Sequence, residues 1–344
     1  MDGTWKLGKR MAGLLLLSAL GWMPQASAKW VNADLLITPE QLQKSVEKAD
    51  WVVVDCRDLD DYLKGHIPGA ISLGGPCGKV LRDPSSRVLE VKKYEDVLGK
   101  VGIGNATHVV VYHGDMSDLT DATTAFWILE YLGHDKVQLL NGGIDAWRKA
   151  GLRLADKPTR KEPTTFRAKV VASRYASTDE IVKIARGQLK GVQVVDSRTA
   201  KEYKGEDIRS VRGGHVPNTT LNVSHRDTLP KVKDAKSDKM VEIAYLDADA
   251  AAAAFGKLDK SARTISYCQT GTRSTLTYLQ HRLLGFKDPA NWDDSWRVYG
   301  AKLEYPVADE QWYNFASVNS KVSALEKKVK ELEAASAKPA GAAK

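Results

Sequence analysis

The sequence is poor in cysteine: Cys56, Cys77 and Cys268 are its three copies among 344 residues. Three cysteines cannot all pair within one chain, so at least one thiol stays outside such a disulfide. None of them belongs to a CxxC pair, and the seven histidines are scattered without an i, i+4 pair. Zinc sites usually show one of these spacings, so the sequence predicts no metal site.

Runs of basic residues are also missing, although the formal net charge is +8. A nucleic-acid-binding protein usually has a basic stripe or an aromatic platform, and this sequence has neither. We therefore expect no nucleic-acid partner. A mildly basic surface instead favours the approach of small anions.

No apolar run is long enough to span a bilayer comfortably. The apolar run at residues 11–22 follows three basic residues and precedes a small-residue cleavage site that ends at Ala28. This order is typical of a secretory signal, so residues 1–28 are predicted to be a signal peptide, with a membrane anchor as the alternative. No cysteine stands at the cleavage site, which argues against a lipoprotein. The mature protein is predicted to be periplasmic or secreted, without a stable membrane anchor.

In an oxidising compartment, a free reactive thiol is prone to oxidation. Two arrangements of the first two cysteines are open. Either Cys56 and Cys77 bond to each other, or one of them is buried and the other exposed. Because Cys56 lies in an apolar strand, we favour a core position for it over the disulfide.

An internal repeat organises the mature chain. The segment WVVVDCR at 51–57 returns as VQVVDSR at 192–198. The segment GHIPGA around His66 is matched by GHVPN around His215, in the same order along the chain. A period this long indicates two whole domains rather than a solenoid. The two histidines occur in both halves, so we expect them to have a structural role.

Each half alternates strands with helical stretches, which predicts a parallel sheet flanked by helices. We expect α/β domains at 29–155 and 174–308, joined by a linker at 156–173. Valine and leucine in alternating steps of three and four predict an amphipathic or coiled-coil helix at 309–334, followed by a disordered tail at 335–344. That helix could dock on the protein's own surface or join copies of the chain into a homo-oligomer.

The candidate catalytic residues lie in one loop of the second half, between Cys268 and Arg273. A strand ends just before Cys268, and a helix begins near Arg273. Backbone N–H groups of such a loop can form an anion nest, and the helix dipole adds positive potential. Both effects favour thiolate over thiol, so Cys268 is predicted to be a low-pKa nucleophile; a buried structural cysteine is the alternative. Gly271 lets the loop curl, and Arg273 can close the loop or meet an anionic substrate.

The loop sequence Cys-Gln-Thr-Gly-Thr-Arg resembles the active-site loop of the rhodanese family of sulfurtransferases, and the paired halves resemble the tandem-domain members of that family. The resemblance covers nearly all of residues 30–308. It implies that Cys268 carries a persulfide from a small anionic sulfur donor to a thiophilic acceptor, without a cofactor. The predicted substrate-binding residues are Gln269, Thr270, Gly271, Thr272 and Arg273 of the loop, with Asp196 and Arg198 at the end of a strand. A structural ion pair is an equal alternative for the last two.

The first half is expected to be catalytically empty, because His113 stands where the second half has Cys268. In tandem rhodaneses the first domain likewise lacks the cysteine and helps to wall the cleft. A loop histidine with satisfied hydrogen bonds is the favoured interpretation of His113, with a residual acid–base role as the alternative.

Comparison within the family indicates which sulfur donor this protein uses. Members that act on mercaptopyruvate typically have a Cys-Gly-Ser-Gly-Val-Thr loop and arginines that hold the keto acid. Here the loop differs, and Glu202 stands where those members and the animal thiosulfate enzymes have an arginine; Arg209 and Arg212 could compensate. Thiosulfate or a related sulfane is therefore the favoured donor, and 3-mercaptopyruvate is the alternative.

The same loop is compatible with two further classes of protein, a phosphatase and a non-catalytic persulfide carrier. Related cell-cycle phosphatases have one more residue between the cysteine and the arginine, which widens the cradle for phosphate and argues against a phosphatase here. A non-catalytic persulfide carrier or docking protein stays open, with the C-terminal helix as its partner site.

Overall fold

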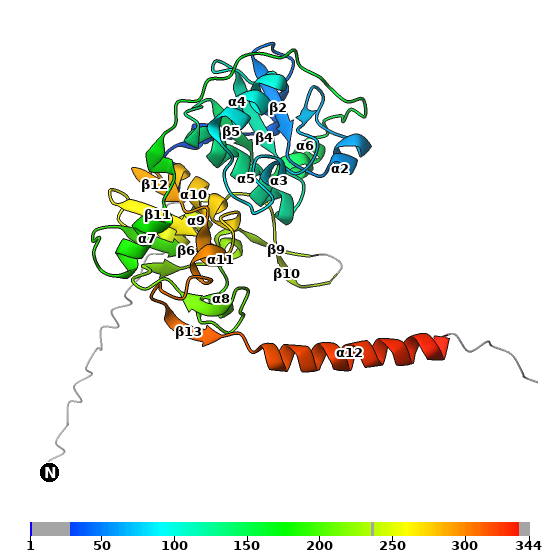
Figure 1. Cartoon of the computed structure of the whole chain (residues 1–344). Coiled ribbons are helices and arrows are strands. Elements are labelled where there is room, and N and C mark those ends of the chain that lie inside the picture. Colours follow the sequence, from blue (N-terminus) through cyan, green and yellow to red (C-terminus); the bar gives the residue numbers. More distant parts are fainter. Residues whose placement is uncertain (2–27, 235–236, 337–344) are drawn as a thin grey trace, which may run out of the picture.

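In this computed structural model the chain folds into two α/β units and a separate C-terminal helix (Figure 1). The structure describes residue 1, residues 28–234 and residues 237–336. Residues 2–27 of the predicted signal peptide and residues 337–344 of the predicted tail lie outside the described residues. Within the described part of the chain, no helix is long and apolar enough to cross a membrane.

The first unit is built on a parallel sheet of five strands in the order β1-β5-β4-β2-β3. Its two central strands are runs of valine that are buried, as a parallel sheet covered by helices requires. The strands are β1 (Leu36–Ile37), β2 (Trp51–Asp55), β3 (Ile71–Ser72), β4 (His108–Tyr112) and β5 (Val137–Leu140). The helices are η1 (Ala33–Leu35), α1 (Pro39–Gln43), α2 (Leu59–Lys64), α3 (Cys77–Val80), α4 (Val91–Lys100), α5 (Met116–Tyr131) and α6 (Gly143–Lys149).

The second unit has a parallel sheet of four strands in the order β12-β11-β6-β8 and two antiparallel pairs, β9 with β10 and β7 with β13. The strands are β6 (Gln193–Asp196), β7 (Arg212–His215), β8 (Leu221–Asn222), β9 (Lys231–Lys233), β10 (Met240–Glu242), β11 (Arg263–Tyr267), β12 (Asp288–Asn291) and β13 (Ala308–Trp312). The helices are η2 (Ala172–Arg174), α7 (Thr178–Ala185), α8 (Ala200–Tyr203), η3 (His225–Thr228), α9 (Ala248–Phe255), α10 (Arg273–Leu283), α11 (Ser295–Tyr299) and α12 (Phe315–Ser336). Two parallel sheets flanked by helices confirm the predicted fold class.

The repeat found in the sequence has a structural counterpart. Asp55 and Asp196 end equivalent strands, β2 and β6, each of which pairs in parallel with the next long strand, β4 or β11. In each unit a histidine, His66 or His215, contacts a tyrosine carbonyl oxygen through Nδ1 and stacks on the ring of the same tyrosine. These contacts support the structural role predicted for both histidines.

The two units pack on each other through α5 and α10, and their facing side chains form one apolar cluster. Polar contacts in this interface include a hydrogen bond of 2.8 Å between the hydroxyls of Thr123 and Thr275. The guanidinium of Arg282 also pairs with the buried carboxylate of Glu130 at 2.8 Å. Because α10 begins at the end of the cysteine loop, this interface fixes the position of that loop against the first unit.

The predicted linker at 156–173 lies along the first unit. Backbone N–H groups of Thr164 and Lys169 donate to carbonyl oxygens of Gly99 and Leu132, at 2.8 and 2.9 Å. Phe166 is buried within the apolar cluster of that unit. The segment has little apolar periodicity in its sequence, yet one aromatic side chain and a few backbone hydrogen bonds hold it in place.

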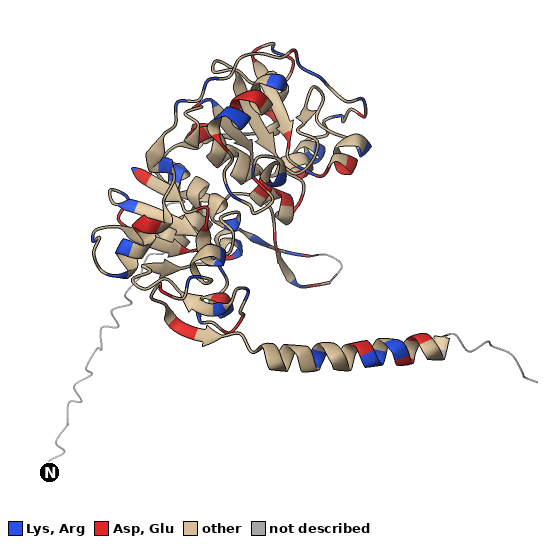
Figure 2. Ribbon diagram, in the orientation of Figure 1, with Lys and Arg blue, Asp and Glu red and all other residues tan. Residues whose placement is uncertain are grey.

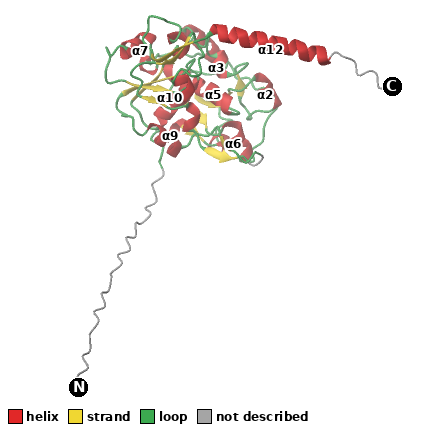
Figure 3. Ribbon diagram, turned by 90° about the horizontal axis from the view of Figure 1, so that it is seen from below, coloured by secondary structure: helices red, strands yellow, loops and turns green. Residues whose placement is uncertain are grey.

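The C-terminal helix begins later than the sequence suggests. Residues 309–312, predicted to start the helix, belong to strand β13, which pairs with β7. Arg212 of β7 anchors this strand through an ion pair of 2.5 Å with Glu310. A pairing between segments almost 100 residues apart therefore overrides the local helical pattern. From Phe315 onward α12 projects away from both units (Figures 1 and 3).

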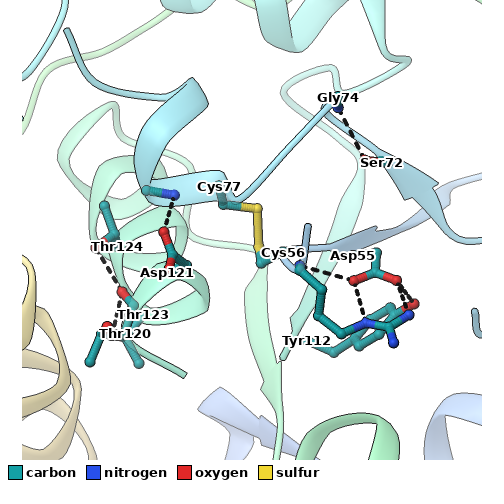
Figure 4. Close-up of a disulfide and its surroundings, with 12 residues drawn as sticks. Asp55, Cys56, Ser72, Gly74, Cys77, Tyr112, Thr120, Asp121, Thr123 and Thr124 are labelled. Atoms are coloured by element: carbon teal, nitrogen blue, oxygen red, sulfur yellow. Dashed lines mark hydrogen bonds and ion pairs between the residues drawn. A yellow bond between two sulfur atoms is a disulfide. The ribbon is translucent and has the colours of Figure 1, made fainter. Parts of the chain in front are cut away.

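Cys56 and Cys77 form a disulfide, and both are buried (Figure 4). The preference for an unpaired core cysteine at position 56 is therefore wrong, although the core position itself is right. Cys56 follows β2, and Cys77 opens the short helix α3, which packs on α5. The two thiols meet only because the chain between them turns back over the carboxyl end of the sheet. The bond anchors the segment that leads to Arg82.

Candidate active site

Cys268 lies at the carboxyl end of β11, and the loop after it leads into α10. The loop is held from one side by the start of α11. The N–H of Cys268 donates to Ser295 Oγ at 3.1 Å, and the N–H of Trp296 donates to the carbonyl oxygen of Cys268 at 3.1 Å. The N–H of Arg297 donates to the carbonyl oxygen of Gln269 at 2.9 Å. These bonds fix the backbone on both sides of the thiol.

Gly271 is required by the loop's shape. Its φ is +74°, in the left-handed region that favours glycine. A Cβ at this position would lie 2.5 Å from the carbonyl oxygen of Asp293. The carbonyl of Gly271 also accepts a hydrogen bond of 3.1 Å from the side chain of Asn291. The predicted role of Gly271 in curling the loop agrees with this geometry.

The surroundings of Cys268 favour its thiolate. The residue is fully buried, and burial raises the pKa of a thiol. The charge of Arg273 and the backbone N–H groups of Thr270 and Ser274 act in the opposite direction, and the pKa of Cys268 is lowered overall. A thiol at the start of a helix whose pKa is lowered by nearby N–H groups and an arginine is what a nucleophilic cysteine needs. Because the thiol is fully buried, a donor reaches it only if neighbouring side chains move.

The start of α10 differs from the start of α5 in the first unit. Asp115 caps α5 with its own carboxylate, which accepts from the N–H groups of Ser117 and Asp118 at 2.7 and 3.3 Å. No side chain caps α10. The N–H groups at the start of the second helix are thus left for an anion at Cys268, whereas those of the first helix are already satisfied. This difference gives a physical reason for the predicted inactivity of the first unit.

His113, the counterpart of Cys268, is also buried. Burial lowers the pKa of His113 to about 4, so the ring is neutral at physiological pH. Its Nδ1 lies 3.2 Å from the carbonyl oxygen of Gly114. Its buried Nε2 has no hydrogen-bond partner among the described residues, so the expectation of a histidine with satisfied hydrogen bonds is met at Nδ1 and not at Nε2.

Arg273 is held by Glu202. Two guanidinium nitrogens of Arg273 donate to the two carboxylate oxygens of Glu202, at 2.8 and 2.7 Å. Burial would raise the pKa of Glu202, but the hydrogen bonds and charge of Arg273 lower it to about 2. Glu202 therefore stays ionised and keeps the guanidinium beside Cys268. The sequence marked Glu202 only as a departure from the family pattern and gave no sign that it binds Arg273.

The two arginines that could replace the missing family arginine have different roles. Arg212 is buried and binds Glu310 and backbone carbonyls of residues 300, 302 and 305, so it is structural. Arg209 is half-exposed and lies beside the cysteine loop, because Gln269 Nε2 donates to its carbonyl oxygen at 2.8 Å. Of the two, only Arg209 lies beside the cysteine loop, and its guanidinium pairs with Asp207 at 2.6 Å.

Asp196 and Arg198 form a buried ion pair of 2.6 Å. The guanidinium of Arg198 also donates to the carbonyl oxygen of Gly214 at 2.8 Å and lies over the ring of Trp296. Asp55 and Arg57 make the same pair in the first unit, which has no cysteine in its loop. Of the two interpretations left open for Asp196 and Arg198, the structure favours the structural ion pair, because both side chains are buried and bind each other.

The first unit supplies an arginine to the cysteine loop. Arg82 lies just after α3, is buried, and donates to Thr272 Oγ1 at 2.8 Å and to the carbonyl oxygen of Gly271 at 3.2 Å. The same guanidinium forms an ion pair of 2.7 Å with Asp293, which in turn accepts from the N–H of Val88 at 2.8 Å. Sequence reasoning missed Arg82, because nothing local marks a residue 190 positions away from its partner.

Fold and site together define the class of protein: a tandem α/β protein with one nucleophilic cysteine loop at the carboxyl end of its second sheet. The family model described as "Rhodanese-like domain" matches residues 38–150 and 181–302. The chain therefore belongs to the rhodanese-like family, with two such domains, and it is a sulfurtransferase of the rhodanese type. Among the described residues, no cluster of three or more His, Cys, Asp or Glu side chains is placed to hold a metal ion.

Several known proteins are similar along most of the chain. A protein of Haloferax volcanii named "Putative thiosulfate sulfurtransferase" is 31% identical over 296 residues, which span 82% of this chain and 94% of that protein. Thiosulfate sulfurtransferase of Mus musculus is 29% identical over 276 residues, spanning 78% of this chain and 89% of the mouse protein. The structure of SseA from Escherichia coli, a 3-mercaptopyruvate sulfotransferase, matches with a TM-score of 0.64 and 21% identity over 76% of this chain and 98% of SseA. That last likeness shows the fold alone.

The charge of Arg273 leads to a pH prediction. Because the pKa of Cys268 is lowered, its thiolate persists below the ordinary thiol range and is lost as pH falls through the lowered value. In Arg273→Gln/Glu202→Gln, which removes both charges of the pair, we expect the midpoint of alkylation rate against pH to rise by about one unit or more. The surface variant Arg226→Gln removes the same charge from an exposed position and should leave the midpoint unchanged. An unmoved midpoint in the double variant would contradict the role given to Arg273.

The buried position of Arg82 leads to a stability prediction. Arg82→Ala leaves the carboxylate of Asp293 buried without its cation, so we expect a loss of about 3 kcal/mol in the free energy of unfolding at pH 8. Burial raises the pKa of Asp293 to about 6 against the opposing charge of Arg82, so the loss should shrink at pH 5, where Asp293 gains a proton. Urea denaturation at the two pH values measures both effects.

A matched control lies next to this pair. Arg87 pairs with Asp294 at 3.1 Å across the same two units, but its side chain is about half-exposed. Arg87→Ala should cost at most about 1 kcal/mol and show little dependence on pH, because exposed ion pairs contribute little. Equal losses in the two variants would show that the buried contact of Arg82 has no special weight.

Proposed function

We propose that this chain is a thiosulfate sulfurtransferase that works through a persulfide on Cys268. The observation that carries the proposal is the position of Cys268 between the end of β11 and the uncapped start of α10. There the charge of Arg273 and the N–H groups of Thr270 and Ser274 lower the pKa of its thiol. The names of the relatives from Haloferax volcanii and Mus musculus support thiosulfate as the donor.

The reaction proceeds in two displacements. The thiolate of Cys268 attacks the sulfane sulfur of thiosulfate; the new S–S bond forms as the S–S bond of thiosulfate breaks, and sulfite leaves with that electron pair. The enzyme then holds Cys268–S–S⁻. Backbone N–H groups of the loop stabilise the terminal sulfur anion, as oxyanion donors stabilise developing charge elsewhere. A thiophilic acceptor such as cyanide attacks the terminal sulfur, leaves as thiocyanate and returns Cys268 to the thiolate. The cycle needs no cofactor.

The pair formed by Glu202 and Arg273 supports thiosulfate over 3-mercaptopyruvate. Both donating nitrogens of the Arg273 fork are occupied by Glu202, so the fork is not free to grip the carboxylate of a keto acid. The half-exposed Arg209 also lies beside the loop, but its guanidinium is bound by the carboxylate of Asp207 at 2.6 Å.

A steady-state assay tests this function. With thiosulfate and cyanide, the purified protein should release thiocyanate, and Cys268→Ser should reduce the rate to that of buffer. We expect kcat/KM for thiosulfate to exceed that for 3-mercaptopyruvate by at least about tenfold, the equivalent of about 1.4 kcal/mol. The opposite ratio would overturn the donor assignment. One equivalent of sulfite released per chain without turnover would favour the persulfide carrier over the enzyme.

We further propose that the protein is exported and acts in the periplasm. The order of basic, apolar and small residues in positions 1–28 supports a cleaved signal peptide. A disulfide between Cys56 and Cys77 fits an oxidising compartment. N-terminal sequencing of the protein from the periplasmic fraction should begin at Lys29. Recovery of the intact N-terminus in the cytosol would contradict export.

We also propose that α12 joins copies of the chain into a homo-oligomer. Support comes from the exposed apolar side chains of this helix. The helix itself extends away from the two units (Figure 3).

A further inference from the structure

The apolar stripe of α12 has no cover within the chain. Its large apolar side chains, at positions 315, 322, 325, 329 and 332, are between 46 and 63% exposed. The helix extends away from the two units in both views of the molecule (Figures 1 and 3). Exposed apolar side chains at this spacing on a soluble protein mark a surface that binds a partner.

The stripe follows a heptad repeat. Phe315, Val322 and Val329 occupy a positions, and Val318, Leu325 and Leu332 occupy d positions. In parallel coiled coils, β-branched residues at a combined with leucine at d favour two strands over three or four. The last two a–d pairs, which combine valine with leucine, have this composition. The pattern therefore favours a pair of helices.

The charges beside the stripe show which helix would fit. Lys321 and Lys328 occupy g positions, and Glu326 and Glu333 occupy the e positions five residues later. Figure 2 shows both basic and acidic segments along this helix. In a parallel pair, each g residue faces the e residue of the next heptad on the other helix. Every such contact between copies of α12 would join a lysine to a glutamate. In an antiparallel pair g faces g and e faces e, which would oppose like charges.

These side chains are free to make such contacts. The charged residues of α12 are exposed, and no ion pair in the part of the chain that the structure describes involves them. The complementarity lies between one copy of the helix and another, rather than between α12 and the rest of its own chain.

We propose that α12 forms a parallel, two-stranded coiled coil with a second copy of this chain, in the register set by Lys321–Glu326 and Lys328–Glu333 contacts. This inference rests on the proposed homo-oligomer and adds its stoichiometry, direction and register. The 22 residues of α12 give a helix about 33 Å long, and fewer than four heptads make a weak coiled coil. The dimer is therefore reversible and depends on protein concentration.

Sedimentation equilibrium of the mature chain, across a range of concentrations, tests the register. Lys321→Glu/Lys328→Glu places glutamate opposite glutamate in all four contacts of the dimer, so we expect the dissociation constant to rise about 100-fold. Glu326→Lys/Glu333→Lys should weaken the dimer similarly. An equimolar mixture of the two variants should restore it as a heterodimer, because every contact is again between opposite charges.

The matched control changes the same charges on the outward face. Lys327 and Lys330 occupy f and b positions, so Lys327→Glu/Lys330→Glu should leave the dissociation constant within about twofold of the parent. Equal weakening by this control would show that net charge, rather than register, governs association, and would overturn the proposed contacts.

Oxidative cross-linking tests direction. In a Cys268→Ser background, Val318→Cys places a thiol at a d position near one end of the helix, where a parallel pair brings the two copies together. We expect an interchain disulfide in the parallel dimer. A dimer that does not cross-link would overturn the parallel direction, and a chain that stays monomeric at all concentrations would overturn the oligomer itself. Neither result bears on the thiocyanate assay, which depends on Cys268 alone.

Discussion

The chemistry of this protein depends on two backbone N–H groups, those of Thr270 and Ser274, that lower the pKa of Cys268. They are available because α10 starts without a side-chain cap. In the first unit the equivalent helix α5 is capped by its own Asp115. One fold therefore provides both a helix start that is internally satisfied and one that holds an anion. This difference gives a physical reason for the predicted inactivity of the first domain.

The thiolate is stabilised by a series of opposite charges. Arg273 favours the anionic sulfur, and the buried carboxylate of Glu202 holds Arg273 through two hydrogen bonds. Behind the loop, Arg82 of the first unit binds two loop residues and the carboxylate of Asp293. The first unit therefore contributes directly to the structure of the active site. It fixes the loop backbone whose N–H groups face the sulfur, and the Cys56–Cys77 disulfide anchors the segment from which Arg82 extends.

Local patterns predicted what local interactions determine. The valine-rich strands, the duplicated domains and the cysteine loop could all be recognised from runs of adjacent residues, because strand burial and turn geometry depend on near neighbours. The Arg82 contact, the Glu202–Arg273 pair and the disulfide depend on tertiary packing, and the sequence alone left them open or missed them. The start of α12 was misplaced for the same reason: pairing of β13 with β7 outweighs the helical pattern at 309–312. Asp196 and Arg198 lie at the carboxyl end of the sheet, as expected, but they bind each other.

The central claim is that one anionic sulfur at Cys268 is the atom that receives and gives up sulfane sulfur. Peptide mass spectrometry of protein treated with thiosulfate, without an acceptor and without reductant, tests it most directly. The account predicts one additional sulfur atom on the peptide that contains Cys268, lost again when cyanide is added. An unmodified Cys268 peptide, or added sulfur that cyanide does not remove, would contradict it.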